Sequence, residues 1–131
     1  MWSKDSVIDE TLLDQSSLDA PRLHCKYLGI LNDYKLLMSK ASYQLKLVKH
    51  QRWMYYSGKE VPEGEEPLDH KILKGEQMNW VSVDKKVLEI ETKIQYYQIG
   101  IDSLTEILKQ LNNRNYVIKN AIEWRRFTSG F

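Results

Sequence analysis

The sequence has few of the residues that end helices or cross-link chains. Its 131 residues include three prolines, six glycines and one cysteine, Cys25. A single cysteine excludes an intrachain disulfide, so we expect a reducing compartment. No stretch approaches the roughly 18 apolar residues of a membrane span, and the first residues lack the apolar core of a signal peptide. We therefore expect no membrane segment and no secretory leader.

Catalytic and metal-binding motifs are also missing from the sequence. Ser57-Gly58-Lys59 lacks the upstream glycine and the following hydroxyl of a phosphate-binding loop, and there is no G-x-S-x-G motif. His24 and Cys25 are adjacent, so on a helix they point about 100° apart, and His50 and His70 have no further ligand at metal spacing. We expect neither an enzyme nor a metal or cofactor site.

Charge is nearly balanced overall but unevenly distributed. The formal net charge is +1, yet residues 20–59 hold eight lysines or arginines against one acid. Residues 1–19 hold five acids and one lysine, and residues 60–81 hold six acids and two lysines. A basic segment between two acidic segments indicates a local basic surface, which the net charge conceals.

Apolar periodicity predicts an all-α fold of long helices. Asp19-Ala20-Pro21 is typical of a helix start and Gly58 of a helix end, which predicts a helix over residues 20–57, about 55 Å long. Residues 58–81 contain two of the prolines and suit a connection with one short helix near residues 68–73. Residues 1–19 suit an acidic arm or a short helix. The predicted long helix carries two apolar stripes, which indicate two buried faces: Leu23, Tyr27, Ile30, Tyr34, Leu37 and Ala41, and Leu28, Leu31, Met38 and Leu45.

A second long helix, residues 82–112, has the clearest apolar pattern in the chain. Its heptad seam comprises Val83, Val87, Ile90, Ile94, Tyr97, Ile101, Leu104, Leu108 and Leu111. Asn112-Asn113-Arg114-Asn115 interrupts the seam, and a C-terminal helix follows over residues 115–128. One chain of this size cannot cover so much apolar surface, so we expect protomers to assemble through helix faces. An isolated three-helix bundle is the alternative.

The end of the first long helix combines cations with aromatic rings. Single-stranded nucleic acid is bound by this combination, because cations follow the phosphates and exposed bases stack on the rings. The alternative is that Trp53, Tyr55 and Tyr56 form a core cluster and the lysines are merely solvated. Helical spacing predicts one DNA-binding face that contains Lys46, Lys49, His50, Trp53 and Tyr56, with Arg52 and Lys59 alongside.

Three segments in a fixed order resemble the UvsY family, the recombination mediators of T-even-type bacteriophages. They are Tyr55-Tyr56-Ser57-Gly58, the stretch from Asp84 to Tyr96, and Ile118-Lys119 followed by Arg125 to Gly130. The resemblance covers about residues 20–130. It implies a non-enzymatic helical protein, assembled into a hexameric or heptameric ring or barrel, that binds single-stranded DNA in the cytoplasm of the infected bacterial host. The implied partners are a UvsX-type recombinase and the phage single-strand-binding protein, from whose DNA complex the mediator helps to load the recombinase.

The resemblance also implies residue roles. The family's DNA-binding Lys-x-Arg falls on His50-Gln51-Arg52, so Arg52 matches and His50 takes the place of the lysine, with Lys49 beside it. The C-terminal region is implied in self-assembly, at Ile118, Ile122, Arg125 and Phe127. Residues 20–131 would then form one domain for DNA binding and oligomerisation. A structural coiled-coil phage assembly or adaptor protein without DNA binding is the alternative function.

Overall fold

The residues that the structure describes form four helices. The computed structural model describes residues 1–8 and 13–130, with the backbone alone over residues 13–18. The helices are α1 (Trp2–Asp5), α2 (Leu13–Tyr56), α3 (Gln77–Ser82) and α4 (Lys85–Thr128). The described residues contain no strand, which confirms the prediction of an all-α chain.

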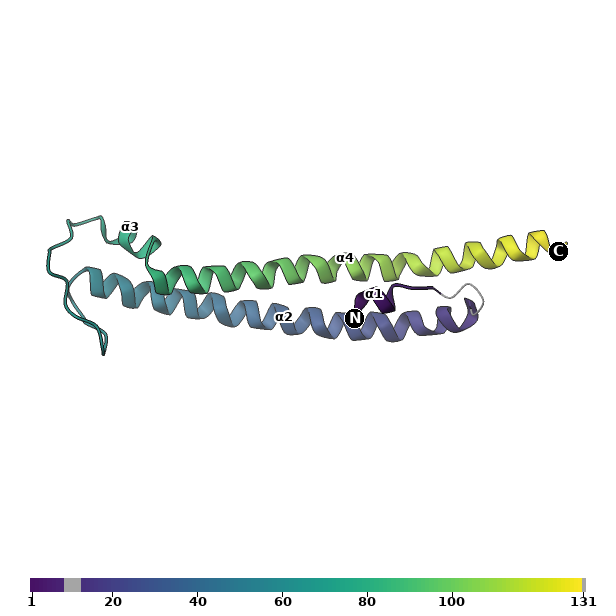
Figure 1. The fold of residues 1–131 in the computed structure, drawn as a ribbon, viewed down its shortest axis with the longest axis horizontal. Coiled ribbons are helices and arrows are strands. Elements are labelled where there is room, and N and C mark those ends of the chain that lie inside the picture. Colours follow the sequence, from purple (N-terminus) through teal and green to yellow (C-terminus); the bar gives the residue numbers. More distant parts are fainter. Residues whose placement is uncertain (9–12, 131) are drawn as a thin grey trace. The chain divides into compact units, whose positions relative to one another are not determined.

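The helices contribute to two compact units. Unit 1 comprises Met1–Tyr34 and Gly100–Phe131, and unit 2 comprises Lys35–Ile99. In each unit a segment of α2 lies beside a segment of α4 (Figure 1). Unit 1 also contains α1, and unit 2 contains α3 together with the connection after α2.

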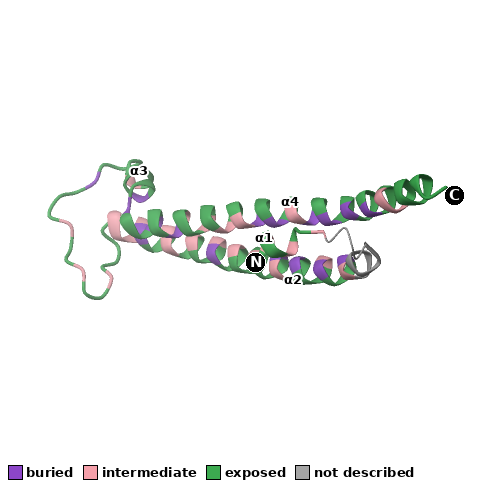
Figure 2. Ribbon diagram, turned by 45° about the vertical axis from the view of Figure 1, so that its right-hand side comes forward, coloured by how far each residue is buried: buried purple, intermediate pink, exposed green. Residues whose placement is uncertain are grey.

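Buried apolar residues recur along α4 at alternating spacings of three and four, as a heptad seam requires (Figure 2). Those of unit 2 are Val87 and Ile90, and those of unit 1 are Ile101, Leu104, Leu108, Leu111 and Ile118. Ile94 and Tyr97 are half-buried. The predicted seam therefore holds except at Val83, which is 67% exposed because it follows α3 and precedes the first turn of α4.

The two predicted stripes of the first long helix do not form two separate buried faces within the protomer. Buried positions of α2 instead include members of both stripes, Leu23, Tyr27 and Ala41 from one and Leu31 from the other. Leu28 and Leu37, one from each stripe, are exposed. Within the protomer, α2 therefore buries one face that runs between the two stripes.

Helix α4 is continuous where the sequence predicts an interruption. Asn112 to Asn115 are helical, and Arg114 occupies the seam with 6% of its surface exposed. Its guanidinium donates a hydrogen bond of 2.8 Å to the backbone carbonyl of Asp5 and lies 5.9 Å from the centre of the Trp2 ring. A buried arginine needs such partners. They come from the start of the chain, so neighbouring residues in the sequence give no sign of them.

Helix α1 is held against α2 as well. The Asp5 carboxylate accepts hydrogen bonds of 2.6 Å from both Lys26 and Tyr27, and Trp2 packs edge-on against the Tyr27 ring. These hydrogen bonds lower the pKa of Asp5, with Lys26 as the larger cause. Burial and the bond to Asp5 raise the pKa of Tyr27 to about 12. This cluster anchors part of the predicted N-terminal arm; residues 9–12 lie outside the described residues.

Two further boundaries differ from prediction. Helix α2 includes residues before Asp19, so Pro21 lies inside the helix, where it removes one hydrogen-bond donor. Ala20 and Leu23 are buried on either side of this proline, and such packing can outweigh local propensity. The short helix of the connection is α3, not residues 68–73; those residues are non-helical, and of them only Ile72 is buried.

Candidate nucleic-acid interface

Helix α2 ends in a Schellman motif. The Gly58 amide donates to the Tyr55 carbonyl at 3.0 Å, and the Lys59 amide donates to the Met54 carbonyl at 3.0 Å. Gly58 has φ of +74°, a left-handed conformation that costs glycine little. This motif fixes the backbone conformation of the last turn of α2, and therefore the positions from which its basic and aromatic side chains project.

Arg52 is buried and ion-paired, with 6% of its surface exposed. Its Nε donates to the Asp84 carboxylate at 2.8 Å, and its Nη1 donates to both Glu65 oxygens at 2.9 and 2.7 Å. The guanidinium carbon lies 4.4 Å from the centre of the Tyr55 ring. Arg52 thus joins the end of α2 to the connection, through Glu65, and to the start of α4, through Asp84.

The charges of this network stabilise one another. Burial opposes the charged form of Arg52, but the bonds to Glu65, Tyr56 and Asp84 outweigh it and raise its pKa. Burial likewise opposes ionisation of Asp84, yet the bonds from Tyr56 and Arg52 leave its pKa below the ordinary value. The pKa of Glu65 is lowered by Lys86 and then by Arg52. Arg52, Asp84 and Glu65 therefore stay charged at neutral pH.

Tyr55-Tyr56-Ser57-Gly58 is mainly a structural motif in this protein. The Tyr55 hydroxyl donates to the Glu66 carbonyl at 2.8 Å, and the Tyr56 hydroxyl donates to the Asp84 carboxylate at 2.6 Å. Burial and the bond to Asp84 raise the pKa of Tyr56, which keeps the hydroxyl a donor. The sequence alternative of a core cluster therefore describes these two tyrosines, which are half-buried and hydrogen-bonded.

A separate set of cations and rings lies on the last turns of α2 and just after its end, and we call it the basic–aromatic face. The His50 and Trp53 rings stack with centres 6.4 Å apart, and the Lys59 ammonium lies 4.7 Å from the centre of the Trp53 ring. Lys49 is half-buried, with its ammonium 3.8 Å from Glu91, a distance typical of a weak exposed ion pair. The face comprises Lys46, Lys49, His50, Trp53 and Lys59.

The predicted DNA-binding residues therefore separate into two groups. Five of them share the basic–aromatic face, whereas Arg52 and Tyr56 bind Asp84 beneath the surface. Three residues of this site, Glu65, Asp84 and Lys86, were not predicted from the sequence. Asp84 has a local signal, because it caps α4 by accepting a bond of 2.9 Å from the Lys86 amide. Glu65 has none, since it is one of several acids in an irregular segment.

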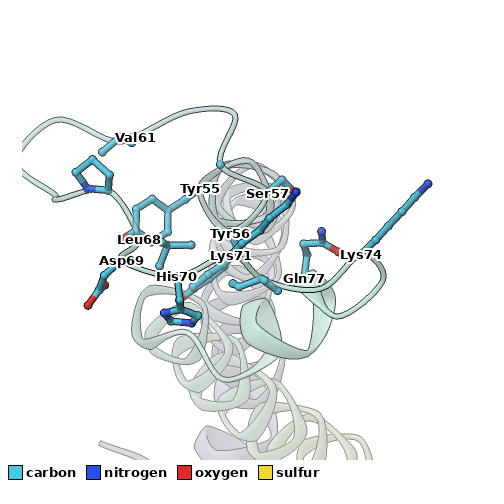
Figure 3. Close-up of a pocket in the computed structure, with 13 residues that line it drawn as sticks. Tyr55, Tyr56, Ser57, Val61, Leu68, Asp69, His70, Lys71, Lys74 and Gln77 are labelled. Carbon is cyan, nitrogen blue, oxygen red and sulfur yellow. The ribbon is translucent and has the colours of Figure 1, made fainter.

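A pocket of about 680 Å³ opens between the end of α2 and the connection (Figure 3). Tyr55, Tyr56 and Ser57 contribute from α2, and His70 and Lys71 are among the residues from the connection. The Ser57 hydroxyl is buried without a hydrogen-bond partner among the described residues. The pocket mixes rings, one acid and two lysines, and it contains no group of metal ligands.

The four predicted self-assembly residues lie along the C-terminal part of α4, in unit 1. Ile118 is buried within the protomer at 2% exposure, Ile122 is half-buried, and Arg125 and Phe127 are exposed. Trp124 stacks on Phe127 with ring centres 5.8 Å apart, and both side chains are largely exposed. The structure therefore assigns Ile118 to the protomer core and leaves an aromatic pair on the surface.

Within the described residues, no helix is both long and apolar enough to cross a membrane. In the same part of the chain, no group of three or more histidine, cysteine or acidic side chains is arranged to hold a metal ion.

The whole chain matches a known protein family. The family model described as "Recombination, repair and ssDNA binding protein UvsY" matches residues 1–131. The chain belongs to the UvsY family. The recombination protein uvsY of Enterobacteria phage T4 is 31% identical over 127 residues, which cover 97% of this chain and 91% of that protein.

Solved structures of UvsY have the same fold. A crystal structure of the bacteriophage T4 recombination mediator protein UvsY, in lattice type I, matches with a TM-score of 0.85 at 30% identity, covering 96% of this chain and 94% of that chain. The lattice type II structure gives a TM-score of 0.84 at 30% identity, covering 98% and 92%. The resemblance seen in the three sequence segments thus extends over the whole chain, and the family is one of recombination, repair and single-stranded-DNA-binding proteins.

Proposed function

We propose that this chain is a recombination mediator whose basic–aromatic face binds single-stranded DNA. In the proposed mechanism it helps to load a UvsX-type recombinase onto DNA covered by the phage single-strand-binding protein, inside the infected bacterial cell. The basic–aromatic face carries this proposal. It offers Lys46, Lys49 and Lys59 to phosphates and the half-exposed Trp53 ring to a base, and these are the two components of sequence-independent strand binding.

We further propose that the protein acts as a homo-oligomeric ring. Unit 2 has apolar side chains on the surfaces opposite its heptad seam, namely Leu36, Tyr43 and Leu47 on α2 and Leu88, Tyr96 and Ile99 on α4. Exposed apolar rows of this length are typical of interfaces. A second copy of the chain is the partner that has complementary rows. Repetition of the basic–aromatic face around a ring would add weak contacts into tight binding.

The salt dependence of DNA binding tests the face. Each phosphate neutralised on a single strand contributes about −0.7 to the slope of log affinity against log salt, so alanine at both Lys46 and Lys49 should make the slope shallower by about 1.4. The measurement is a salt titration of fluorescent oligothymidine. Alanine at Lys40 and Lys93, two exposed lysines outside the face, removes the same charge and should leave the slope nearly unchanged. Equal slopes for both double variants would contradict the proposed face.

Trp53 is the expected stacking residue. Trp53→Ala should weaken oligothymidine binding by roughly 1–3 kcal/mol with an unchanged salt slope, because a stacked ring contributes affinity without releasing counterions. Trp53→Phe keeps an aromatic ring and should retain most of the affinity. Melting curves of both variants separate stacking from packing. A large fall in melting temperature with intact DNA binding would make Trp53 a packing residue and favour the alternative of a structural protein.

A further inference from the structure

The Glu65 carboxylate occupies a site with the chemistry of a phosphate-binding site. It accepts two hydrogen bonds from Arg52 Nη1, and the Lys86 ammonium contacts the same carboxylate. The Tyr55 ring covers one face of the guanidinium. A guanidinium nitrogen and a lysine ammonium that converge on one anion suit a phosphate as well as a carboxylate.

The two carboxylates on Arg52 differ in how firmly they are held. Asp84 is 5% exposed, caps α4 and also accepts the Tyr56 hydroxyl bond, so its place is fixed by several contacts. Glu65 is 24% exposed and comes from an irregular segment. Of the two carboxylates on Arg52, Asp84 is therefore the firmly held partner and Glu65 the one that can exchange.

Few bonds hold the segment that carries Glu65. Between residues 61 and 72 of the described chain, the one backbone–backbone hydrogen bond is a local turn from the Glu65 amide to the Pro62 carbonyl, at 3.1 Å. The other polar tethers are the Glu65 ion pairs and the bond from the Tyr55 hydroxyl to the Glu66 carbonyl. Segments with few backbone bonds open at low free energy, so withdrawal of Glu65 disturbs no regular structure.

The site adjoins the basic–aromatic face. Arg52 follows Lys49 by three residues and precedes Trp53 by one on α2, and Lys86 is 54% exposed at the start of α4. To reach Glu65, a strand whose phosphates follow Lys46 and Lys49 must extend toward Lys86 at the start of α4, and there its negative charge opposes the carboxylate.

We propose that Arg52 and Lys86 form a phosphate-binding site that Glu65 fills in the free protein and that a phosphate of the DNA strand takes over on binding. The inference rests on the proposed function, since the strand must lie along the basic–aromatic face to reach the site. When a phosphate replaces the Glu65 carboxylate, Arg52 and Lys86 both keep an anionic partner. The connection between α2 and α3, which Glu65 holds in place, is then released. Glu65 thus sets a threshold against weak or non-specific anions.

A neutral substitution at Glu65 tests the proposal. Glu65→Gln should tighten oligothymidine binding about fivefold to tenfold at low salt, since the strand no longer displaces a competing anion. Glu63→Gln is the matched control, because Glu63 lies in the same segment, is exposed and has no ion pair within the described residues. It should change affinity less than about twofold. Adding Lys86→Gln to Glu65→Gln should abolish the gain.

A second measurement uses the unaltered protein, in case Glu65→Gln disturbs folding. Trypsin cleavage after Lys71 and Lys74 reports release of the connection, and saturating oligothymidine should accelerate it. Equal affinity gains in Glu65→Gln and Glu63→Gln would overturn the proposal, as would a gain that survives Lys86→Gln or protection of both lysines by DNA. The proposed function fails separately, by unchanged salt slopes in the Lys46 and Lys49 double variant.

Discussion

Replacement of Arg52 by alanine is expected to lower the free energy of unfolding by about 3–5 kcal/mol. The change removes the common cation between Glu65 and Asp84, and Asp84 is then buried with an uncompensated charge. Thermal and urea unfolding of the variant measure the loss. Arg52→Lys should recover only part of it, because one ammonium cannot reproduce the bonds of Nε and Nη1 at their fixed separation.

Lys49→Ala is the matched control for Arg52→Ala. Lys49 lies three residues earlier on the same helix and forms a partly exposed ion pair at 3.8 Å, which should contribute less than about 1 kcal/mol to stability. The two variants should therefore differ in what they change. Arg52→Ala should mainly lower the free energy of unfolding, whereas Lys49→Ala should change only the salt dependence of DNA binding. An Arg52→Ala protein that melts as the parent does but no longer binds DNA would contradict the structural role.

The seam of α4 could be predicted because it depends on local periodicity alone. Val87 to Leu111 repeat at three and four residues without a break, and no distant residue is needed to recognise that pattern. Val83 fits the same spacing but lies outside the helix, and only the position of the Asp84 cap, one residue further, distinguishes it.

Two of the differences share one cause, which is a partner distant in the sequence. Asn112 to Asn115 suggested a break because polar residues interrupt the seam, yet Arg114 is satisfied by Asp5 from the start of the chain. Arg52 lies among cations in the sequence, yet it is buried and pairs with Glu65 and Asp84, which are 13 and 32 residues away. Spacing on one helix shows which residues share a face, but not whether that face meets solvent.

The Tyr-Tyr-Ser-Gly segment, one of the three that resemble the family, consists of residues that mainly stabilise the structure of this protein. Tyr55 and Tyr56 secure the helix end through Glu66 and Asp84, and Gly58 closes the helix. A motif that shapes a binding site needs fixed side chains, whereas cations that follow phosphates need only lie on the right face. The tyrosine motif therefore positions the basic–aromatic face, and the arginine network beneath it supplies the rigidity.

The C-terminal residues of α4 should divide in the same way, into core and interface. Phe127→Glu is expected to weaken self-association while the protomer stays folded, because Phe127 is 75% exposed and the added charge must be desolvated only where copies meet. Ile118→Glu places the same charge in the protomer core, where Ile118 is 2% exposed, and should lower the free energy of unfolding by several kcal/mol. Ile122→Glu should fall between them, since Ile122 is half-buried.

Sedimentation velocity at micromolar protein, paired with helical melting curves, separates the two effects. For Phe127→Glu we expect smaller species at an unchanged melting temperature, together with weaker oligothymidine binding, because fewer faces act together on one strand. Ile118→Glu should lose helical structure and assembly over the same temperature range. If Phe127→Glu sediments as the parent does, the exposed pair of Trp124 and Phe127 lies outside the interface, and the apolar rows of unit 2 are left to carry the assembly.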